Sequence, residues 1–343
     1  MAETSFALYR KYRPDSFDSV RNQEHIISVL EGAIKKGMIP HALLFTGSRG
    51  TGKTTVARIF AHAIGAQDID IYEIDAASNR GIDDIRALKE AVHTLPYESP
   101  YKVYIIDEVH MLTKEAWNAL LKTLEEPPEH VVFILATTEL DKILDTITSR
   151  CQVFTFRAPT RAELTELVRD IAKQEKLTIT EAGANVIALA ANGSYRDALS
   201  IMQKVLMASH DAKLDHDEIA LIVGAPKAIL IYEFMQALEN RDLEKALTTL
   251  RNADQTNCNI QLFHSLILER MRAILLVRHK ALGQEMLTDF YEDERSLIIA
   301  AAQNAKSPIH SALLLRFLEA GDRIQYAHMK TLPLELAVIE GLS

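Results

Sequence analysis

Residues 1–157 alternate short apolar runs with amphipathic stretches, which predicts a parallel β-sheet flanked by helices. Four apolar runs are predicted to be buried strands, and a fifth run follows them: Ala42–Thr46, Ile71–Asp75, Val103–Asp107, Val131–Ala136 and Val153–Phe156. Between the first two runs, apolar residues recur at helical spacing and predict one buried helix stripe: Val56, Ile59, Phe60, Ala63 and Ile64. The chain therefore runs strand, loop, helix, strand in this region.

After Pro159 the strand signals stop and helical signals replace them. Thr160 and Glu163 form a capping-box pattern, and the segment 193–197 (GSYRD) opens another helix. From Pro226 onward the pattern is helical throughout. We expect an α/β domain over residues 1–158, a small helical lid domain over 159–225 and an all-helical domain over 226–343.

Composition and charge narrow the class of protein. Of 343 residues, 48% are hydrophobic and 25% are charged, as in folded globular chains. A net charge of −9 indicates no general attraction to nucleic acid, so any DNA contact must be local. Cys151 and Cys258 fit neither a disulfide framework nor a zinc-ligand spacing. With no apolar signal segment and no run near the ~18 residues of a membrane helix, we expect a cytoplasmic protein without a membrane partner.

A glycine-rich segment matches the phosphate-binding pattern GxxxxGK[ST] at every fixed position and lies between a predicted strand and a predicted helix. This context disfavours a chance glycine-rich turn. The backbone N–H groups of such a loop converge on phosphate oxygens at the start of the helix. The residues expected to bind the nucleotide are Gly47, Ser48, Arg49, Gly50, Thr51, Gly52, Lys53, Thr54 and Thr55. Among them, Lys53 is expected to reach the β- and γ-phosphates, and Thr54 to bind Mg²⁺.

Two carboxylates, Asp107 and Glu108, end a predicted strand, which places them at the sheet edge beside the phosphate loop. We expect Asp107 to hold Mg²⁺ and Glu108 to polarise the attacking water. The alternative is an acidic helix cap at a strand end. Thr138 follows the next predicted strand, where its hydroxyl is expected either to contact the γ-phosphate or its water, or simply to end the strand.

Two arginines are candidates for contacts with the γ-phosphate. Arg150 precedes the last predicted strand and is expected at a subunit edge. An exposed arginine of this kind is usually only solvated. If a neighbouring subunit presents ATP to it, however, it can raise the rate of ATP hydrolysis about 10³–10⁵-fold. Arg196, at the start of a lid helix, could contact the γ-phosphate from within the same chain. For His110, beside the acidic pair, a structural or supporting role is favoured over a catalytic one.

Together these motifs resemble the bacterial clamp-loader AAA+ ATPases, the family of DNA polymerase III subunit gamma/tau. The resemblance covers nearly the whole chain, through LPLELAVIE at the C-terminus, and its segments include YRKYRPDSFDSV, GSRGTGKTT, EIDAASNRGIDDIR, YIIDEVHMLT, NALLKTLEEPPEHVVFILATTE, ITSRCQVF and GSYRDALS. It implies a pentameric ring containing further copies of the chain and subunits of the delta and delta-prime type. In that ring, ATP binding opens the sliding clamp, primer-template DNA enters, and hydrolysis releases the loader.

The same resemblance implies roles for individual residues and for the last domain. Arg150 would be the arginine finger that acts in trans, Arg196 would be sensor 2 and Thr138 sensor 1. The adenine pocket would be formed around Tyr12, Arg13 and Pro14. The C-terminal helical domain would be the collar that holds the ring closed.

Three departures from the family pattern are visible. The family's four-cysteine zinc module is missing, because only Gly65–Asp70 separates the phosphate-loop helix from the next strand, so no zinc is expected. The chain ends at the collar, without the longer form's extension for helicase and polymerase, and we therefore do not expect it to tether the polymerase directly. Asn22 precedes Gln23 where the family often has glycine.

Contacts with macromolecules are less specific in the sequence. The resemblance would turn Arg80 and Arg86 toward DNA phosphates inside the ring, whereas the alternative is a solvated helix face. Trp117 could face the clamp or pack in the core. Competing functions are another AAA+ DNA motor, such as a branch-migration helicase or an archaeal-type clamp-loader small subunit, and a non-catalytic ring scaffold. EEPPEHV together with the collar argues against the motors, and the complete set of nucleotide-site residues argues against the scaffold.

Overall fold

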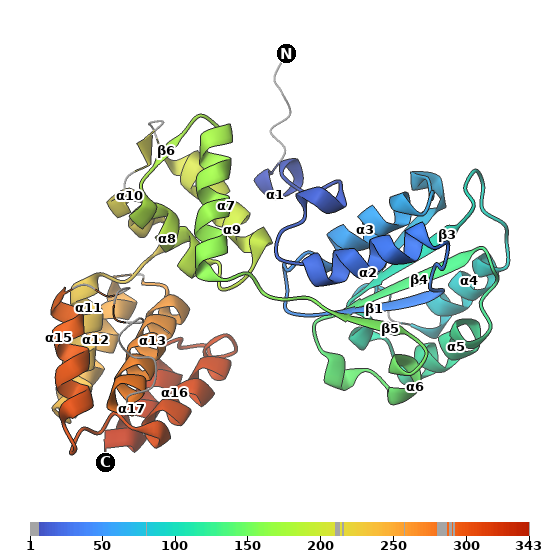
Figure 1. Ribbon diagram of the computed structural model, residues 1–343. Coiled ribbons are helices and arrows are strands. Elements are labelled where there is room, and N and C mark those ends of the chain that lie inside the picture. Colours follow the sequence, from blue (N-terminus) through green and yellow to red (C-terminus); the bar gives the residue numbers. More distant parts are fainter. Residues whose placement is uncertain are drawn as a thin grey trace. The chain divides into compact units, whose positions relative to one another are not determined.

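The computed structural model describes residues 7–79, 81–209, 213–214, 216–256, 258–279, 287, 290 and 292–342. The chain divides into two compact units, one formed by residues 1–171 and 191–203 and the other by residues 172–190 and 204–343 (Figure 1). The three-domain division at residues 158 and 225 stays a prediction.

The first unit is built on a five-stranded parallel sheet with the order β2-β3-β4-β1-β5. All five predicted strands are present within one residue at either end: β1 (Ala42–Thr46), β2 (Ile71–Asp75), β3 (Lys102–Asp107), β4 (Val131–Thr137) and β5 (Gln152–Thr155). The predicted α/β class is therefore confirmed. Strand β4 pairs with both β1 and β3. The end of β4 therefore lies at the same edge of the sheet as the glycine-rich loop after β1 and the carboxylates at the end of β3, and between them.

Helices cover both faces of this sheet (Figure 1). Side chains of a strand alternate between its two faces, and both faces carry apolar side chains that the helices bury. One face carries Leu43, Phe45 and Ile105 and packs in one cluster with residues of α2 (Glu24–Lys35) and α3 (Lys53–Ala63). The other face packs with α4 (Ile82–Val92), α5 (Lys114–Glu125) and α6 (Asp145–Thr148). Trp117 and Leu120 of α5 are buried in this second cluster, so Trp117 is a core residue and not a surface for the clamp.

Two details of the predicted core are wrong. The strand β2 is not buried: it is an edge strand, paired only with β3, and its side chains are exposed or half-buried. On α3, Ala63 is exposed, whereas Ala57 and Ala61 are buried. The buried stripe therefore includes Ile64 directly after the helix but not Ala63, which points to solvent.

The N-terminal segment contains α1 (Leu8–Lys11) and the 3-10 turn Phe17–Ser19. Asn22 has φ 61°, a left-handed conformation that glycine or asparagine adopts most readily. Asparagine is therefore compatible with this position. Gln23 is buried and bridges to the backbone of Arg157, with Nε2 donating to its carbonyl oxygen at 2.8 Å.

Helix α7 (Arg161–Gln174) begins with the predicted capping box, in which the Thr160 N–H donates to Glu163 Oε2 at 2.7 Å and the Glu163 N–H to Thr160 Oγ1 at 3.3 Å. After α7 the chain is not wholly helical, because β6 (Thr178–Ile179) and β7 (Lys213–Leu214) form a short parallel pair. The remaining helices of this region are α8 (Glu181–Ala190), α9 (Tyr195–Ala208) and α10 (His216–Val223).

The rest of the second unit is a helical bundle with one apolar core, as the sequence predicts. Its helices are α11 (Ala228–Glu239), α12 (Leu243–Gln255), α13 (Ile260–Arg278), α15 (Glu292–Gln303), α16 (Ser311–Ile324) and α17 (Leu332–Leu342). Arg278 joins two of them, because its guanidinium donates to the carbonyl oxygens of Ala301 and Ile309, at 3.0 and 2.7 Å. No helix in the described ranges is long and apolar enough to cross a membrane.

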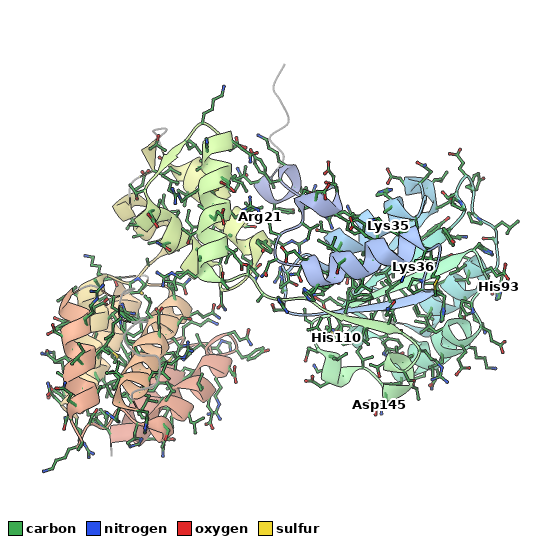
Figure 2. The ribbon with its side chains drawn as sticks, in the orientation of Figure 1. Arg21, Lys35, Lys36, His93, His110 and Asp145 are labelled. Carbon is green, nitrogen blue, oxygen red and sulfur yellow. The ribbon has the colours of Figure 1, made fainter. Side chains whose placement is uncertain are left out.

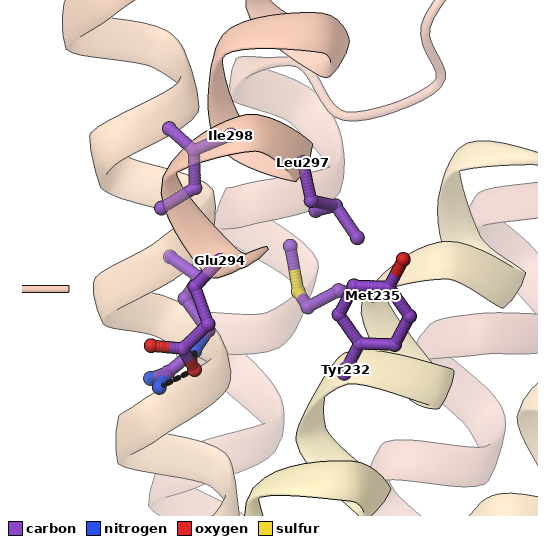
Figure 3. Close-up of a pocket in the computed structure, with 6 residues that line it drawn as sticks. Tyr232, Met235, Glu294, Leu297 and Ile298 are labelled. Carbon is purple, nitrogen blue, oxygen red and sulfur yellow. Dashed lines mark hydrogen bonds and ion pairs between the residues drawn. The ribbon is translucent and has the colours of Figure 1, made fainter. Parts of the chain in front are cut away.

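A small pocket opens in this bundle (Figure 3). Its polar wall is the ion pair between Arg270 of α13 and Glu294 of α15, and its remaining walls come from Tyr232 and Met235 of α11 and Leu297 and Ile298 of α15. None of these residues belongs to the predicted nucleotide site. The pocket is therefore a feature of the bundle alone.

Candidate nucleotide site

The glycine-rich loop connects the end of β1 to the start of α3, where the motif requires it. Gly50 and Gly52 have φ of 76° and 102°, values that side chains other than glycine rarely adopt. A Cβ at Gly47 would lie 2.8 Å from the carbonyl oxygen of Phe156. Thr51 closes the loop on itself, with Oγ1 donating to the Ser48 carbonyl oxygen at 2.9 Å, whereas Arg49 is exposed. These contacts fix the loop's path and keep glycine at its turning points.

Lys53 is the first residue of α3 and its side chain folds back over the loop. Its Nζ donates to the carbonyl oxygens of Gly47 and Ser48, at 2.7 and 2.9 Å. Burial lowers the pKa of this ammonium, while Glu108 and Asp107 partly offset that effect. The cation is therefore held at the mouth of the loop, facing both carboxylates across the edge of the sheet.

Thr54 and Asp107 meet directly, since Thr54 Oγ1 donates to Asp107 Oδ2 at 2.7 Å. The two side chains come from the start of α3 and the end of β3. A hydroxyl and a carboxylate are hard oxygen donors of the kind that Mg²⁺ prefers, with phosphate oxygens and water completing its shell. In the described part of the chain no three His, Cys, Asp or Glu side chains cluster closely enough to hold a metal by themselves. The residues present therefore fit a Mg²⁺ that is bound together with a nucleotide.

Glu108 follows Asp107 in a left-handed conformation, with φ 49°. Its Oε2 accepts a hydrogen bond from Thr138 Oγ1 at 3.1 Å, and its backbone N–H donates to Asp107 Oδ1 at 3.0 Å. The structure thus brings together the carboxylate predicted as the base and the threonine predicted as a sensor. A non-glycine residue in this conformation is uncommon and is concentrated at functional sites.

The N-terminal segment reaches the same region through Arg13, whose Nε donates to Thr55 Oγ1 at 3.1 Å. Burial lowers the pKa of Arg13, and the nearby cations Arg58 and Arg196 lower it further. Tyr12 and Pro14, on either side of Arg13, are half-buried. A concentration of positive charge beside the glycine-rich loop suits a polyphosphate.

The lid helix α9 also begins against the loop. The backbone N–H of Tyr195 donates to the carbonyl oxygen of Gly50 at 3.1 Å, and Ser194 caps α9 by accepting from the Asp197 N–H at 3.1 Å. Arg196 is thereby brought beside Arg13, with its guanidinium 5.6 Å from the ring centre of Tyr9. Neither Ser194 nor Tyr9 was among the predicted site residues, although the small residue next to Gly193 was a usable signal.

Arg150 has partners outside this constellation. Its Nη2 forms an ion pair with Glu125 Oε1 at 2.6 Å, and its Nη1 donates to the Thr146 carbonyl oxygen at 2.7 Å. Its side chain is 35% exposed, so a neighbouring chain could reach it. Arg80 and the side chain of Arg86 lie outside the described residues. A DNA contact by these two arginines therefore stays a prediction.

The fold and the loop place the chain among proteins with a P-loop nucleotide-binding fold of the AAA+ class. Two family models match, the DNA polymerase III delta subunit over residues 63–160 and the ATPase lid domain of the DNA polymerase III clamp loader subunit over residues 163–210. Solved structures of the Holliday junction branch migration motor RuvB of Thermotoga maritima share this fold: one is 22% identical with a TM-score of 0.53, covering 70% of this chain and 85% of its own.

Curated relatives fix the family more narrowly. The chain is 32% identical to DNA polymerase III subunit gamma of Buchnera aphidicola over 292 residues, 79% of each chain. It is 43% identical to DNA polymerase III subunit tau of Bacillus subtilis over 265 residues, 71% of this chain and 47% of that protein. The chain belongs to the DNA polymerase III subunit gamma/tau family. It spans about half the length of the tau and gamma/tau relatives it matches.

Proposed function

We propose that this chain is an ATPase subunit of a DNA polymerase III clamp loader, which loads a sliding clamp onto primer-template DNA. The observation that carries the ATPase part is the convergence of Thr54 on Asp107 and of Thr138 on Glu108 beside one glycine-rich loop. Family membership supports the clamp-loading part. As a replication protein the chain would act in the cytoplasm.

In this proposal each contact at the loop has a chemical role. The loop N–H groups and Lys53 bind the phosphates of ATP, and Arg13 and Arg196 add positive charge beside them. Thr54 and Asp107 would hold Mg²⁺, which neutralises charge on the β- and γ-phosphates. Glu108 orients and polarises the attacking water, and Thr138 holds its carboxylate. Arg150 would complete the site of a neighbouring subunit.

Assembly into a ring is proposed through the C-terminal bundle. Leu332 and Leu336 lie four residues apart on α17 and are 42% and 46% exposed. Leu315 and Leu318 form a similar exposed pair on α16, at 58% and 46%. The helices α16 and α17 pack against each other, and exposed apolar side chains on both would suit a protein interface. The partners would be further copies of this chain and subunits of the delta and delta-prime type.

The test measures ATP hydrolysis by the complex assembled from this chain and its candidate partners. Turnover should rise when the sliding clamp and primed DNA are both present, and Lys53→Ala should abolish nucleotide binding or turnover. Lys35→Ala, a substitution in α2 away from the loop, is the matched control. A turnover rate indifferent to both clamp and DNA would exclude the clamp-loader role while leaving an ATPase.

A further inference from the structure

One buried imidazole links the ends of two neighbouring strands. His110 lies in the 3-10 turn Val109–Met111 directly after β3, and its side chain is only 7% exposed (Figure 2). Its Nδ1 lies 3.0 Å from Thr137 Oγ1, at the end of β4, and 3.4 Å from Glu108 Oε2. Its Nε2 lies 3.3 Å from Glu139 Oε1. The ring therefore has oxygen partners at both nitrogens, and one of them is the carboxylate proposed as the base.

The partners of His110 are themselves fixed. Thr137 is fully buried, and its Oγ1 accepts from the Glu139 N–H at 3.0 Å. Glu139 forms an ion pair with Lys142 of the turn Leu140–Lys142, at 2.7 Å. The hydrogen bond from Lys142 lowers the pKa of Glu139, with smaller contributions from the charges of Lys142 and His110 and an opposing one from burial. An anchored anion thus holds the outer edge of the imidazole.

The inner edge faces the Glu108 oxygen that Thr138 also contacts. Oε2 of Glu108 accepts from Thr138 Oγ1 at 3.1 Å and has His110 Nδ1 at 3.4 Å. Glu108 is attached through a left-handed backbone, and the N–H of Met111 donates to its carbonyl oxygen at 2.9 Å. One carboxylate oxygen therefore has two polar neighbours, Thr138 directly after β4 and His110 in the turn that follows β3. A side chain fixed in this way loses less freedom when it must orient a water.

We propose that His110 is a positioning residue for Glu108, holding its carboxylate in register with the end of β4 through Thr137 and Glu139. The proposal rests on the ATPase function proposed above. His110 transfers no proton to the substrate in this scheme; it sets where the base lies. A misplacement of the base by about 1 Å can cost on the order of 10²-fold in rate.

Asparagine and glutamine at residue 110 separate the two edges of the ring. The amide nitrogen of asparagine can take the place of Nδ1 and that of glutamine the place of Nε2, and both are polar and neutral. In the assembled complex, His110→Asn should keep kcat within about threefold of wild type, and His110→Gln should lower it about 10- to 100-fold. Both variants should keep the wild-type melting temperature and the wild-type affinity for a non-hydrolysable ATP analogue.

A wild-type kcat in His110→Gln would overturn the proposal. It would also be overturned if both variants lost nucleotide affinity in proportion to kcat, because that result would indicate a purely structural role for His110. If either variant fails to fold, Thr137→Val replaces it, because valine keeps nearly the same shape and removes the hydroxyl that His110 Nδ1 contacts. This change should lower kcat at unchanged nucleotide affinity, and an unchanged kcat would contradict the proposal. A wild-type complex without ATPase activity would instead refute the proposed function.

Discussion

Gly50 of the phosphate loop packs directly against Ser194 at the start of α9. A Cβ at residue 50 would overlap Ser194 Oγ and lie 3.0 Å from Ser194 Cβ. The carbonyl oxygen of the same glycine accepts the Tyr195 N–H at 3.1 Å. The beginning of the lid helix is therefore attached to the loop by both a close approach and a hydrogen bond. Any change in the loop's shape must move the backbone that carries Arg196.

Gly50→Ala should destabilise this attachment. The substitution adds the cost of a left-handed alanine, about 1–2 kcal/mol, to an overlap with Ser194. Gly37→Ala is the matched control, because Gly37 also has a positive φ, 63°, but has open space where its Cβ would be. Chemical unfolding should show a larger decrease in the free energy of unfolding for Gly50→Ala than for Gly37→Ala. Equal losses would mean that the contact with Ser194 contributes nothing.

Arg150→Ala should separate binding from hydrolysis. Nucleotide affinity should stay close to wild type, whereas turnover of the assembled ring should fall about 10³-fold or more if Arg150 acts on a neighbour's ATP. The lost ion pair with Glu125 should cost the fold only about 0.2–1 kcal/mol, because both side chains are partly exposed. Arg21→Ala, which removes a similarly exposed arginine paired with Asp170, is the control. Normal turnover in the Arg150 variant would refute the trans assignment.

Asp70 should make the fold sensitive to acid. This buried carboxylate accepts from the backbone N–H groups of Tyr97, Glu98 and Ser99, at 2.6, 3.0 and 3.0 Å. Burial alone would raise the pKa of Asp70, but these hydrogen bonds outweigh it and lower the pKa. The pKa of Asp70 is thus lower in the folded state than in the unfolded state. The stabilisation from the ionised carboxylate is therefore fully present above the unfolded-state pKa of about 3.9, and it is lost as the pH falls through the folded-state pKa.

Asp70→Asn should therefore cost about 1–3 kcal/mol near neutral pH, since an amide NH₂ then faces backbone donors. The deficit relative to wild type should shrink as the pH falls below about 4. Unfolding midpoints measured across this range check both statements. Asp68→Asn is the control, because Asp68 lies in the same turn and its side chain is 96% exposed. This substitution should change neither the stability near neutral pH nor its dependence on pH. A deficit for Asp70→Asn that is independent of pH would exclude the ionised carboxylate as its cause.

His264 should give the helical bundle a second pH dependence, at higher pH. Its Nε2 lies 2.7 Å from the carbonyl oxygen of Phe317, and a Cβ at Gly321 would overlap the ring. Burial lowers the pKa of His264, while the Phe317 hydrogen bond and the charge of Asp322 oppose that shift. The neutral imidazole is thus favoured by folding. The contribution of His264 to stability should be fully present above its unfolded-state pKa of about 6.5. It should decline as the pH falls below that pKa, because the unfolded chain then takes up a proton more readily than the folded one.

His264→Gln keeps a donor for Phe317 and removes the titrating ring. Its unfolding midpoint should depend less on pH than that of wild type between about pH 7.5 and 5. His328→Gln, at an exposed position, should retain the wild-type dependence. If the two variants respond to pH alike, the buried imidazole is not the source of the effect.

The sequence was sufficient for the features encoded by local patterns. The unit from β1 through the loop to α3 was predictable because a strand, a glycine motif and a helical stripe follow one another along the chain. The same holds for β3 ending in Asp107, since an apolar run followed by two carboxylates is a contiguous signal. The capping box at Thr160 and Glu163 is also local, and its hydrogen bonds form as predicted.

Only the tertiary structure decided which residues meet across the chain. Apolar periodicity could not tell that β2 is an edge strand, because burial depends on how many neighbours a strand acquires, and for the same reason it could not assign Trp117 to the core. The partners of His110, the attachment of Gly50 to Ser194 and the pairing of Arg150 with Glu125 all join segments distant in sequence. The sequence determined the chemical groups of the site and their order along the chain. The packing of strands and helices determined which of those groups lie within hydrogen-bonding distance, because that distance depends on the whole fold.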